Sequence, residues 1–268
     1  VVRAAAHALL DGAPVERSGR VRGAGLAEPD GCGLDGHLLP VGDDEHIAVV
    51  RPGSTAEPKW ALTTRLFNYF LIGMLCFVAS AASFHGYYSK WGMREGNKEF
   101  SLKAMFDGTA HRPWVYRQLI PVTATVIDST IPPSVHAPLT HQLLEVAKRT
   151  NFDRQLKDGQ PLARDPAYTV RYFIVYTLAF VSLFAASMLL ICLCRQHGVT
   201  LAASLLGSLF FVLMLPFLQT IGGYYYDLSE LAFMAAYLVL LPQRHSRWAC
   251  VPLTLLATVN KEAFLFFI

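Results

Sequence analysis

Asn260, Lys261 and Glu262 place two charged side chains inside an otherwise apolar stretch near the end of the sequence. A helix that begins at Trp248 reaches Lys261 after about 20 Å, because each residue adds about 1.5 Å. A charge at that depth of a bilayer is costly unless it is paired, and such charges are functional by default. Two readings stay open: a substrate site, and a structural ion pair between crossings with a re-entrant break at Asn260.

A second cluster is the segment YYYDLSE at 224–230, which opens another apolar stretch. Asp227 and Glu230 have the spacing of a capping box, with Asp227 as the N-cap and Glu230 three residues further on. The three tyrosines, Tyr225 among them, can belong to an interfacial aromatic belt or can stack on a sugar ring. Lys261 and Glu262 point about 100° apart on a helix, so at least one of them needs a partner elsewhere, and Asp227 or Glu230 lies at a compatible depth.

Asp107 and the segment HRPWVYRQLIP at 111–121, which includes Arg112, Tyr116 and Arg117, form the third cluster. Two arginines this close in sequence can hold a phosphate or a carboxylate. Tyr116, which lies between them, is a further candidate for substrate binding. A carboxylate such as that of Asp107 can take a proton from an acceptor hydroxyl. In the alternative reading both arginines contact lipid phosphates, and Asp107 only begins a turn.

The elements that position these clusters follow from the distribution of apolar residues. The chain is 53% hydrophobic and 16% charged, whereas about a quarter of the residues in soluble domains are charged. Apolar runs without charges predict an integral membrane protein that contacts the lipid bilayer and crosses it at least four times. A net charge of +3 does not indicate nucleic-acid binding. The predicted crossings are 66–84, 172–194, 199–221, 227–241 and 248–268.

The short linkers between crossings predict an orientation. The linkers at 194–198 and 243–248 contain arginine, whereas the turn at 222–227 has neither lysine nor arginine. The positive-inside rule therefore places the N-terminus and both basic linkers in the cytoplasm. The loop at 85–166 then lies outside, because loops longer than about 60 residues translocate largely regardless of their charge. All three clusters share this outer side.

The remaining segments complete the expected architecture. Within the outer loop 85–166, the segments 111–133 and 136–149 are not long enough to span, and we expect amphipathic helices at the outer membrane surface. Residues 1–60 predict a polar, disordered cytoplasmic tail. Residues 61–268 predict an all-α, polytopic transmembrane helix bundle. Because the sequence lacks an initial methionine and stops inside an apolar run, we expect a fragment.

Taken in order, the RPWVYRQLIP segment in a long outer loop, the YYYD turn and the NKE segment resemble the GT-C superfamily of polytopic membrane glycosyltransferases, over residues 66–268. The resemblance implies a bacterial inner-membrane enzyme that takes a sugar from a polyprenyl-phosphate donor at the outer face. It implies that Asp107 is the catalytic base, that Arg112 and Arg117 hold the donor phosphate, and that Lys261 assists. The histidines and cysteines show no metal-ligand spacing, so the participation of a divalent metal stays open.

Two alternatives to a glycosyltransferase follow from the same residues. In a transporter or lipid-carrier protein, Glu230, Lys261 and Glu262 would form a relay or a substrate site. That reading predicts inverted repeats, and the five apolar segments show none. In a non-catalytic subunit of a membrane complex, the clusters would only hold helices together. The gathering of charged and aromatic residues on one side favours the transferase.

Overall fold

The computed structural model describes most of the chain after residue 58 as helices joined by turns. The described residues are 59–93, 99–149, 162–220, 223–243 and 247–267. The chain divides into two compact units, 13–67 and a second one that contains 68–268, and the fold below is that of the second unit. The described part holds no strand, which confirms the predicted all-α class. The predicted tail at 1–60 lies almost wholly outside the described residues.

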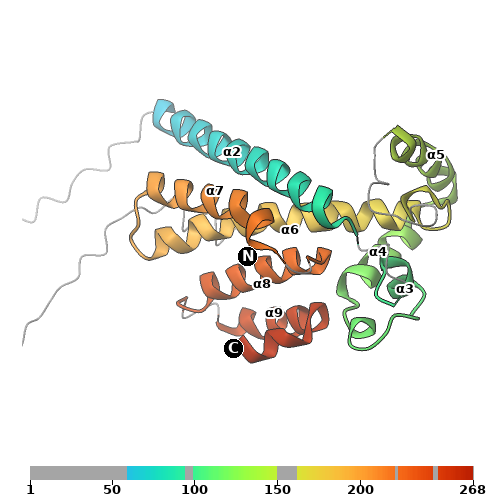
Figure 1. Cartoon of the computed structure of the whole chain (residues 1–268). Coiled ribbons are helices and arrows are strands. Elements are labelled where there is room, and N and C mark those ends of the chain that lie inside the picture. The colour runs from blue at the N-terminus through green and yellow to red at the C-terminus, as the bar shows by residue number, and fades with distance from the viewer. Residues whose placement is uncertain (1–58, 94–98, 150–161, 221–222, 244–246, 268) are drawn as a thin grey trace, which may run out of the picture. The chain divides into compact units, whose positions relative to one another are not determined.

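The helices follow one another in a simple order (Figure 1). They are α2 (Lys59–Trp91), α3 (Leu102–Phe106), η1 (Trp114–Tyr116), α4 (Leu119–Thr130), α5 (Pro133–Arg149), η2 (Leu162–Arg164), α6 (Thr169–Gln196), α7 (Leu201–Leu218), α8 (Tyr225–Leu240), α9 (Arg247–Asn260) and η3 (Glu262–Phe267).

Three of the described helices are long and apolar enough to cross a membrane, as in a membrane protein. They are the Leu66–Trp91 part of α2, then α6 and α7, and they match the first three predicted crossings. Helix α8 has 16 residues and α9 has 14, which gives each a length of about 21–24 Å against a hydrocarbon core of about 30 Å. The fourth and fifth crossings therefore stay predictions.

Helix α6 is the centre of the helical unit. It packs against α4, α5, α7 and α8, and Figure 1 shows α7 on one side of it and α8 on the other. Its buried residues recur every three or four positions, as one face of a helix requires; they include Tyr172, Val175, Ala179, Leu183 and Ala186. By contrast, large apolar side chains on the outer face of α7 are exposed, as expected of a surface that faces lipid; examples are Leu206, Phe210 and Phe217.

The long loop between α2 and α6 folds as helices of its own. The prediction of two helices is confirmed, although their bounds differ: α4 begins at Leu119 rather than near 111. It ends at Thr130, just before Pro132 and Pro133, because proline disfavours helical backbone in the residue before it. Pro133 then opens α5, at a position where proline is well tolerated.

Buried tyrosines fasten the loop to the long helices. Tyr87 of α2, Tyr172 of α6 and Tyr225 of α8 are almost fully buried in one core with Leu102 and Met105 of α3. The hydroxyl of Tyr225 donates a hydrogen bond to Met105 Sδ at 2.9 Å. This core holds the loop at the end of the bundle where α6 and α8 begin.

Candidate functional site

Helix α8 begins one turn earlier than its sequence suggests. Tyr224, with extended backbone, is the N-cap, and Asp227 is the third helical residue. Oδ2 of Asp227 accepts a hydrogen bond from the backbone N–H of Tyr224 at 2.9 Å. The negative charge of this carboxylate also interacts favourably with the positive end of the helix dipole. The predicted capping box with Asp227 as N-cap and Glu230 as its partner is therefore wrong. Burial of Tyr225 and Tyr226 in the core draws both residues into the helix.

Lys261 pairs with both acids of α8. Its Nζ lies 3.2 Å from Asp227 Oδ1 and 2.6 Å from Glu230 Oε2. The spacing of three residues puts the two carboxylates on the same face of α8, where one ammonium group can reach both. This confirms the pairing that the sequence predicts.

The chain breaks at Lys261, between α9 and η3, as the re-entrant alternative anticipated. Helix α9 ends at Asn260, and η3 begins at Glu262. Residues 248–268 therefore do not form one continuous helix. The break turns Lys261 toward α8, which packs against α9.

Arg117 joins this arrangement from the loop. Its Nη2 donates to Glu262 Oε1 at 2.9 Å, and its Nε lies 3.4 Å from Glu262 Oε2. Its Nη1 donates to the hydroxyl of Tyr226 at 2.6 Å, and the guanidinium lies over that ring at 4.9 Å. Burial disfavours the charged form of Arg117, but the hydrogen bonds and charges of Glu262 and Tyr226 outweigh burial and raise its pKa above the usual range.

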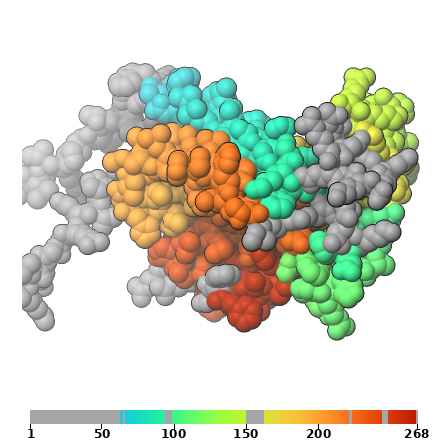
Figure 2. Space-filling model, viewed as in Figure 1, coloured from blue at the N-terminus to red at the C-terminus, as the bar shows by residue number. Residues whose placement is uncertain are grey.

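These contacts define a charge cluster at the beginning of α8. It consists of Arg117, Asp227, Glu230, Lys261 and Glu262. The loop supplies the arginine, α8 supplies two acids, and the segment after α9 supplies the lysine and the third acid. Figure 2 shows the red C-terminal segment against the green surface of α4, in agreement with the contacts between α4 and α9.

Asn260 fixes the position of the two charged residues that follow it. Its side chain is 1% exposed. Its Nδ2 donates to the backbone carbonyl of Tyr226 at 3.0 Å, and its Oδ1 accepts from Ser229 Oγ at 3.2 Å. Both ends of the amide are thus used to hold α9 on α8, as buried polar groups require. The prediction that Asn260 binds substrate stays a prediction.

An aromatic wall stands beside the charge cluster. The rings of Tyr224 and Tyr226 are stacked with centroids 5.0 Å apart, and those of Phe100 and Trp114 with centroids 4.9 Å apart. Phe100 meets Tyr224 edge-on at 6.0 Å and so links the two pairs. Sequence reasoning assigned no role to Phe100, whose surroundings show no motif. The signal in the sequence that could have indicated this aromatic wall is Trp114, which lies three residues before Arg117.

The structure separates the remaining predicted residues from the charge cluster. Asp107 is exposed at the end of α3, and its Oδ1 accepts a hydrogen bond from the hydroxyl of Tyr168 at 2.7 Å. Arg112 is exposed and lies over the ring of Tyr116 at 5.9 Å. Among the described residues, neither Asp107 nor Arg112 shares a hydrogen bond or ion pair with the charge cluster.

The bond to Asp107 changes the acidity of Tyr168. This hydrogen bond, assisted by burial and by the negative charge of Asp107, raises the pKa of the Tyr168 phenol. The cause is direct, because removing the proton would place two negative charges side by side.

A second polar network lies where α4, α5 and α6 meet, and sequence reasoning missed it. Asp128 Oδ1 lies 2.9 Å from His136 Nε2, and Asp128 Oδ2 lies 3.1 Å from Arg171 Nε. The guanidinium of Arg171 also lies over the ring of Tyr168 at 5.4 Å. These contacts fasten the loop helices to α6.

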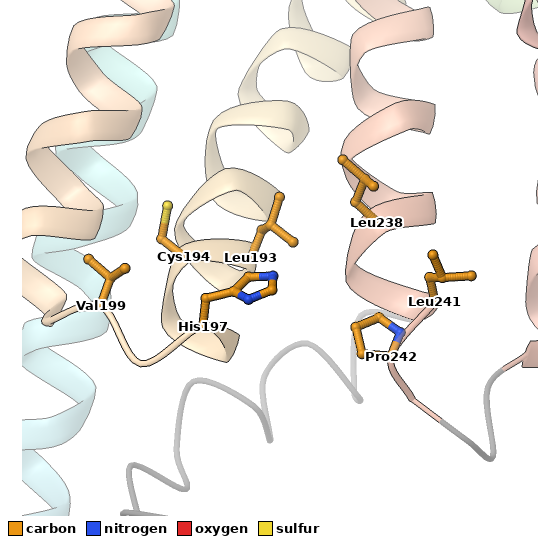
Figure 3. A pocket seen from close by; sticks show the side chains of 7 residues that line it. All are labelled: Leu193, Cys194, His197, Val199, Leu238, Leu241 and Pro242. Carbon is orange, nitrogen blue, oxygen red and sulfur yellow. The ribbon is translucent and has the colours of Figure 1, made fainter. Parts of the chain in front are cut away.

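An apolar pocket lies at the other ends of α6 and α8 (Figure 3). Its lining residues are Leu193, Cys194, His197, Val199, Leu238, Leu241 and Pro242. The figure shows the His197 ring pointing into the space between the two helix ends, with Cys194 turned away from it. No group in this lining carries a charge pair or an acid, so the chemistry of the protein is better sought at the charge cluster.

Comparisons with known proteins and with metal sites add no further assignment. No family model, no curated protein and no solved structure matches the chain. Within the described ranges, no group of three or more histidine, cysteine, aspartate or glutamate side chains could hold a metal ion.

Proposed function

We propose that the chain belongs to a multi-pass glycosyltransferase of the bacterial inner membrane, with its N-terminus in the cytoplasm. The enzyme transfers a sugar from a polyprenyl-phosphate donor to an acceptor at the outer face. The observation that carries the proposal is the charge cluster beside the aromatic wall, at one end of a bundle of apolar helices.

The residue types suit the three parts of such a reaction. Arg117 provides positive charge for a leaving phosphate, whose developing charge fixed donors stabilise, whereas the charge of Lys261 is balanced by Asp227 and Glu230. The stacked rings of Tyr224 and Tyr226 offer a flat apolar surface of the kind on which sugar rings pack. The carboxylates provide hydrogen-bond acceptors for sugar hydroxyls.

In the proposed step, an acceptor hydroxyl gives its proton to a carboxylate base while its oxygen bonds to the anomeric carbon of the sugar. The bond from that carbon to the phosphate oxygen breaks, and the phosphate leaves with the electron pair. Asp107, which among the described residues shares no hydrogen bond or ion pair with the charge cluster, is the base that the resemblance implies. Its exposed carboxylate already accepts a proton-bearing hydroxyl, that of Tyr168, in the way an acceptor alcohol would bind.

The test is direct transfer by the full chain in proteoliposomes supplied with a panel of polyprenyl-phosphate hexoses and a bacterial envelope extract as the source of acceptor hydroxyls. We expect release of free polyprenyl phosphate from at least one donor, and we expect Arg117→Gln to abolish it. Arg149→Gln, which alters an arginine at the far end of α5, is the matched control and should retain activity. Absence of release from every donor would contradict the proposal.

Ion-coupled transport is a second candidate, favoured by the shared position of Lys261 between Asp227 and Glu230. Ionisable residues within membrane segments pair with one another and mark ion pathways and proton relays. Proton-driven solute uptake into the same proteoliposomes, lost in Glu230→Gln, would support transport over transfer.

A further inference from the structure

We infer that a phosphate group binds the edge of Arg117 that Glu262 occupies, and that it does so by displacing the glutamate. The inference rests on the proposed function for the identity of the natural ligand, a phosphate carried by a lipid. The binding site itself is defined by the geometry of Arg117 alone.

The edge of the guanidinium that Glu262 uses is the edge that a phosphate needs. A phosphate binds arginine most strongly through two parallel hydrogen bonds from one edge of the planar group. Nη1 of Arg117 donates to the Tyr226 hydroxyl, whereas the two oxygens of Glu262 face Nε and Nη2. A carboxylate and a phosphate present equivalent oxygen pairs, so Glu262 stands in for the anion.

The two partners differ in how easily they can move. The Arg117 side chain is 13% exposed, and the Tyr226 ring holds its guanidinium in place. The Glu262 side chain is 44% exposed, so its carboxylate can turn into solvent and regain its hydration there. Displacement therefore moves the glutamate and leaves the arginine in place.

The charges of the cluster make Glu262 the acid that can leave. Asp227 is held by the backbone N–H of Tyr224 as well as by Lys261, and Glu230 is held by Lys261. Release of Glu262 keeps Lys261 fully paired and frees only the cation that the incoming anion neutralises. A neutral sugar hydroxyl would not replace the negative charge that Arg117 loses when Glu262 leaves, so the site selects for an anionic group.

The inference is tested by binding of inorganic phosphate to the full chain in detergent, measured by isothermal titration calorimetry. We expect Glu262→Gln to bind phosphate about tenfold more tightly than the wild type, which corresponds to about 1.4 kcal/mol, because the competing charge is gone. Arg117→Gln should bind no phosphate. Glu145→Gln, which removes the acid from an exposed ion pair with Lys148 on α5, should bind as the wild type does.

A second variant covers a failure of Glu262→Gln to fold. Glu262→Asp keeps the charge but withdraws the carboxylate by one methylene, and it should bind phosphate a few-fold more tightly than the wild type. If every folded variant at this position binds phosphate no more tightly than the wild type, Glu262 is a structural partner of Arg117 and the inference is overturned.

The source of the phosphate is resolved by comparing three probes, each with wild type and Glu262→Gln. Inorganic phosphate tests the edge of Arg117 alone, farnesyl phosphate tests a lipid-linked monophosphate, and nanodiscs with phosphatidylglycerol test a bilayer headgroup. Preference for farnesyl phosphate supports a polyprenyl donor, and preference for phosphatidylglycerol nanodiscs contradicts it. These measurements need no turnover, so failure of sugar transfer with intact phosphate binding would overturn only the proposed function.

Discussion

The ammonium group of Lys261 lies 2.6 Å from Oε2 of Glu230, a residue of the neighbouring helix α8. Asp227 approaches the same nitrogen at 3.2 Å. A lysine in the break between α9 and η3 is thus neutralised by the helix against which α9 packs. The pair explains how charges can occupy an apolar part of the chain.

Removing Lys261 should destabilise the fold. In Lys261→Met, Asp227 and Glu230 face each other without a cation, and we expect the free energy of unfolding to fall by about 2 kcal/mol. This loss is smaller than that from breaking a fully buried ion pair, because the three side chains are partly exposed. The measurement is denaturant unfolding in detergent followed by circular dichroism.

A control variant and a double variant test whether the loss of stability in Lys261→Met comes from the ion pair. Lys148→Met breaks an exposed pair with Glu145 and should cost less than about 1 kcal/mol. Lys261→Met combined with Glu230→Gln should recover part of the stability, because one uncompensated charge is removed. A double variant as unstable as the sum of its single variants would contradict the pairing.

Asn260 should matter for stability more than for recognition. Asn260→Leu has a similar volume but removes the two buried hydrogen bonds that join Asn260 to the Tyr226 carbonyl and the Ser229 hydroxyl, so we expect the free energy of unfolding to fall by about 1–3 kcal/mol. Ser229→Ala removes only one of the two bonds and should cost less. Thermal unfolding of both variants in detergent checks the order; equal or reversed effects would show that Asn260 does not join the helices.

Part of this arrangement could be predicted because few physical solutions exist. An uncharged apolar run of eighteen residues or more has little alternative to a membrane-compatible helix, so the predicted crossings coincide with parts of α2, α6 and α7. Helix α2 extends beyond its predicted crossing at both ends, from Lys59 to Trp91. Lys261 needed an acid at similar depth, and the beginning of α8 offered two. In both cases the alternative structure would carry a large free-energy penalty, from unsatisfied backbone groups in the first case and from an unpaired charge in the second.

The rest depends on packing between residues far apart in sequence. Arg117 and Glu262 are separated by 145 positions, and nothing local indicates that they meet. The N-cap of α8 was misplaced because Asp227 is a better N-cap by type than Tyr224, whereas burial of the following tyrosines decided the outcome. Phe100 joins the site through ring contacts.

Tyr168 should titrate at a higher pH than an ordinary tyrosine because of Asp107. The folded-state pKa is raised above the unfolded value of about 10, so the stabilisation is fully present below pH 10 and is lost as the pH rises through the folded-state pKa. Asp107→Asn should return the pKa of Tyr168 toward its ordinary value. The check is the phenolate absorbance of each protein minus that of its Tyr168→Phe counterpart; an unchanged titration would show that the two groups are not bonded in solution.

The same substitution tests the proposed base. Asp107→Asn should abolish sugar transfer while the protein still inserts into membranes, because an amide cannot accept the proton of the acceptor hydroxyl. Tyr168→Phe removes the hydroxyl that bonds to Asp107 and keeps the carboxylate, so it should retain transfer. The measurement is release of polyprenyl phosphate in proteoliposomes. Full activity of Asp107→Asn would leave the base to be sought among the carboxylates of the charge cluster.

The predicted orientation places His111 outside the cell and His197 in the cytoplasm, and both side chains are exposed. In a variant whose native cysteines are replaced by serine, His111→Cys should react with a membrane-impermeant maleimide added to intact spheroplasts. His197→Cys should react only after the membrane is permeabilised, because short basic linkers are retained in the cytoplasm. Labelling of both sites after permeabilisation is the control for accessibility. The reverse pattern would place the charge cluster on the cytoplasmic side, where an outer-face transferase could not use it.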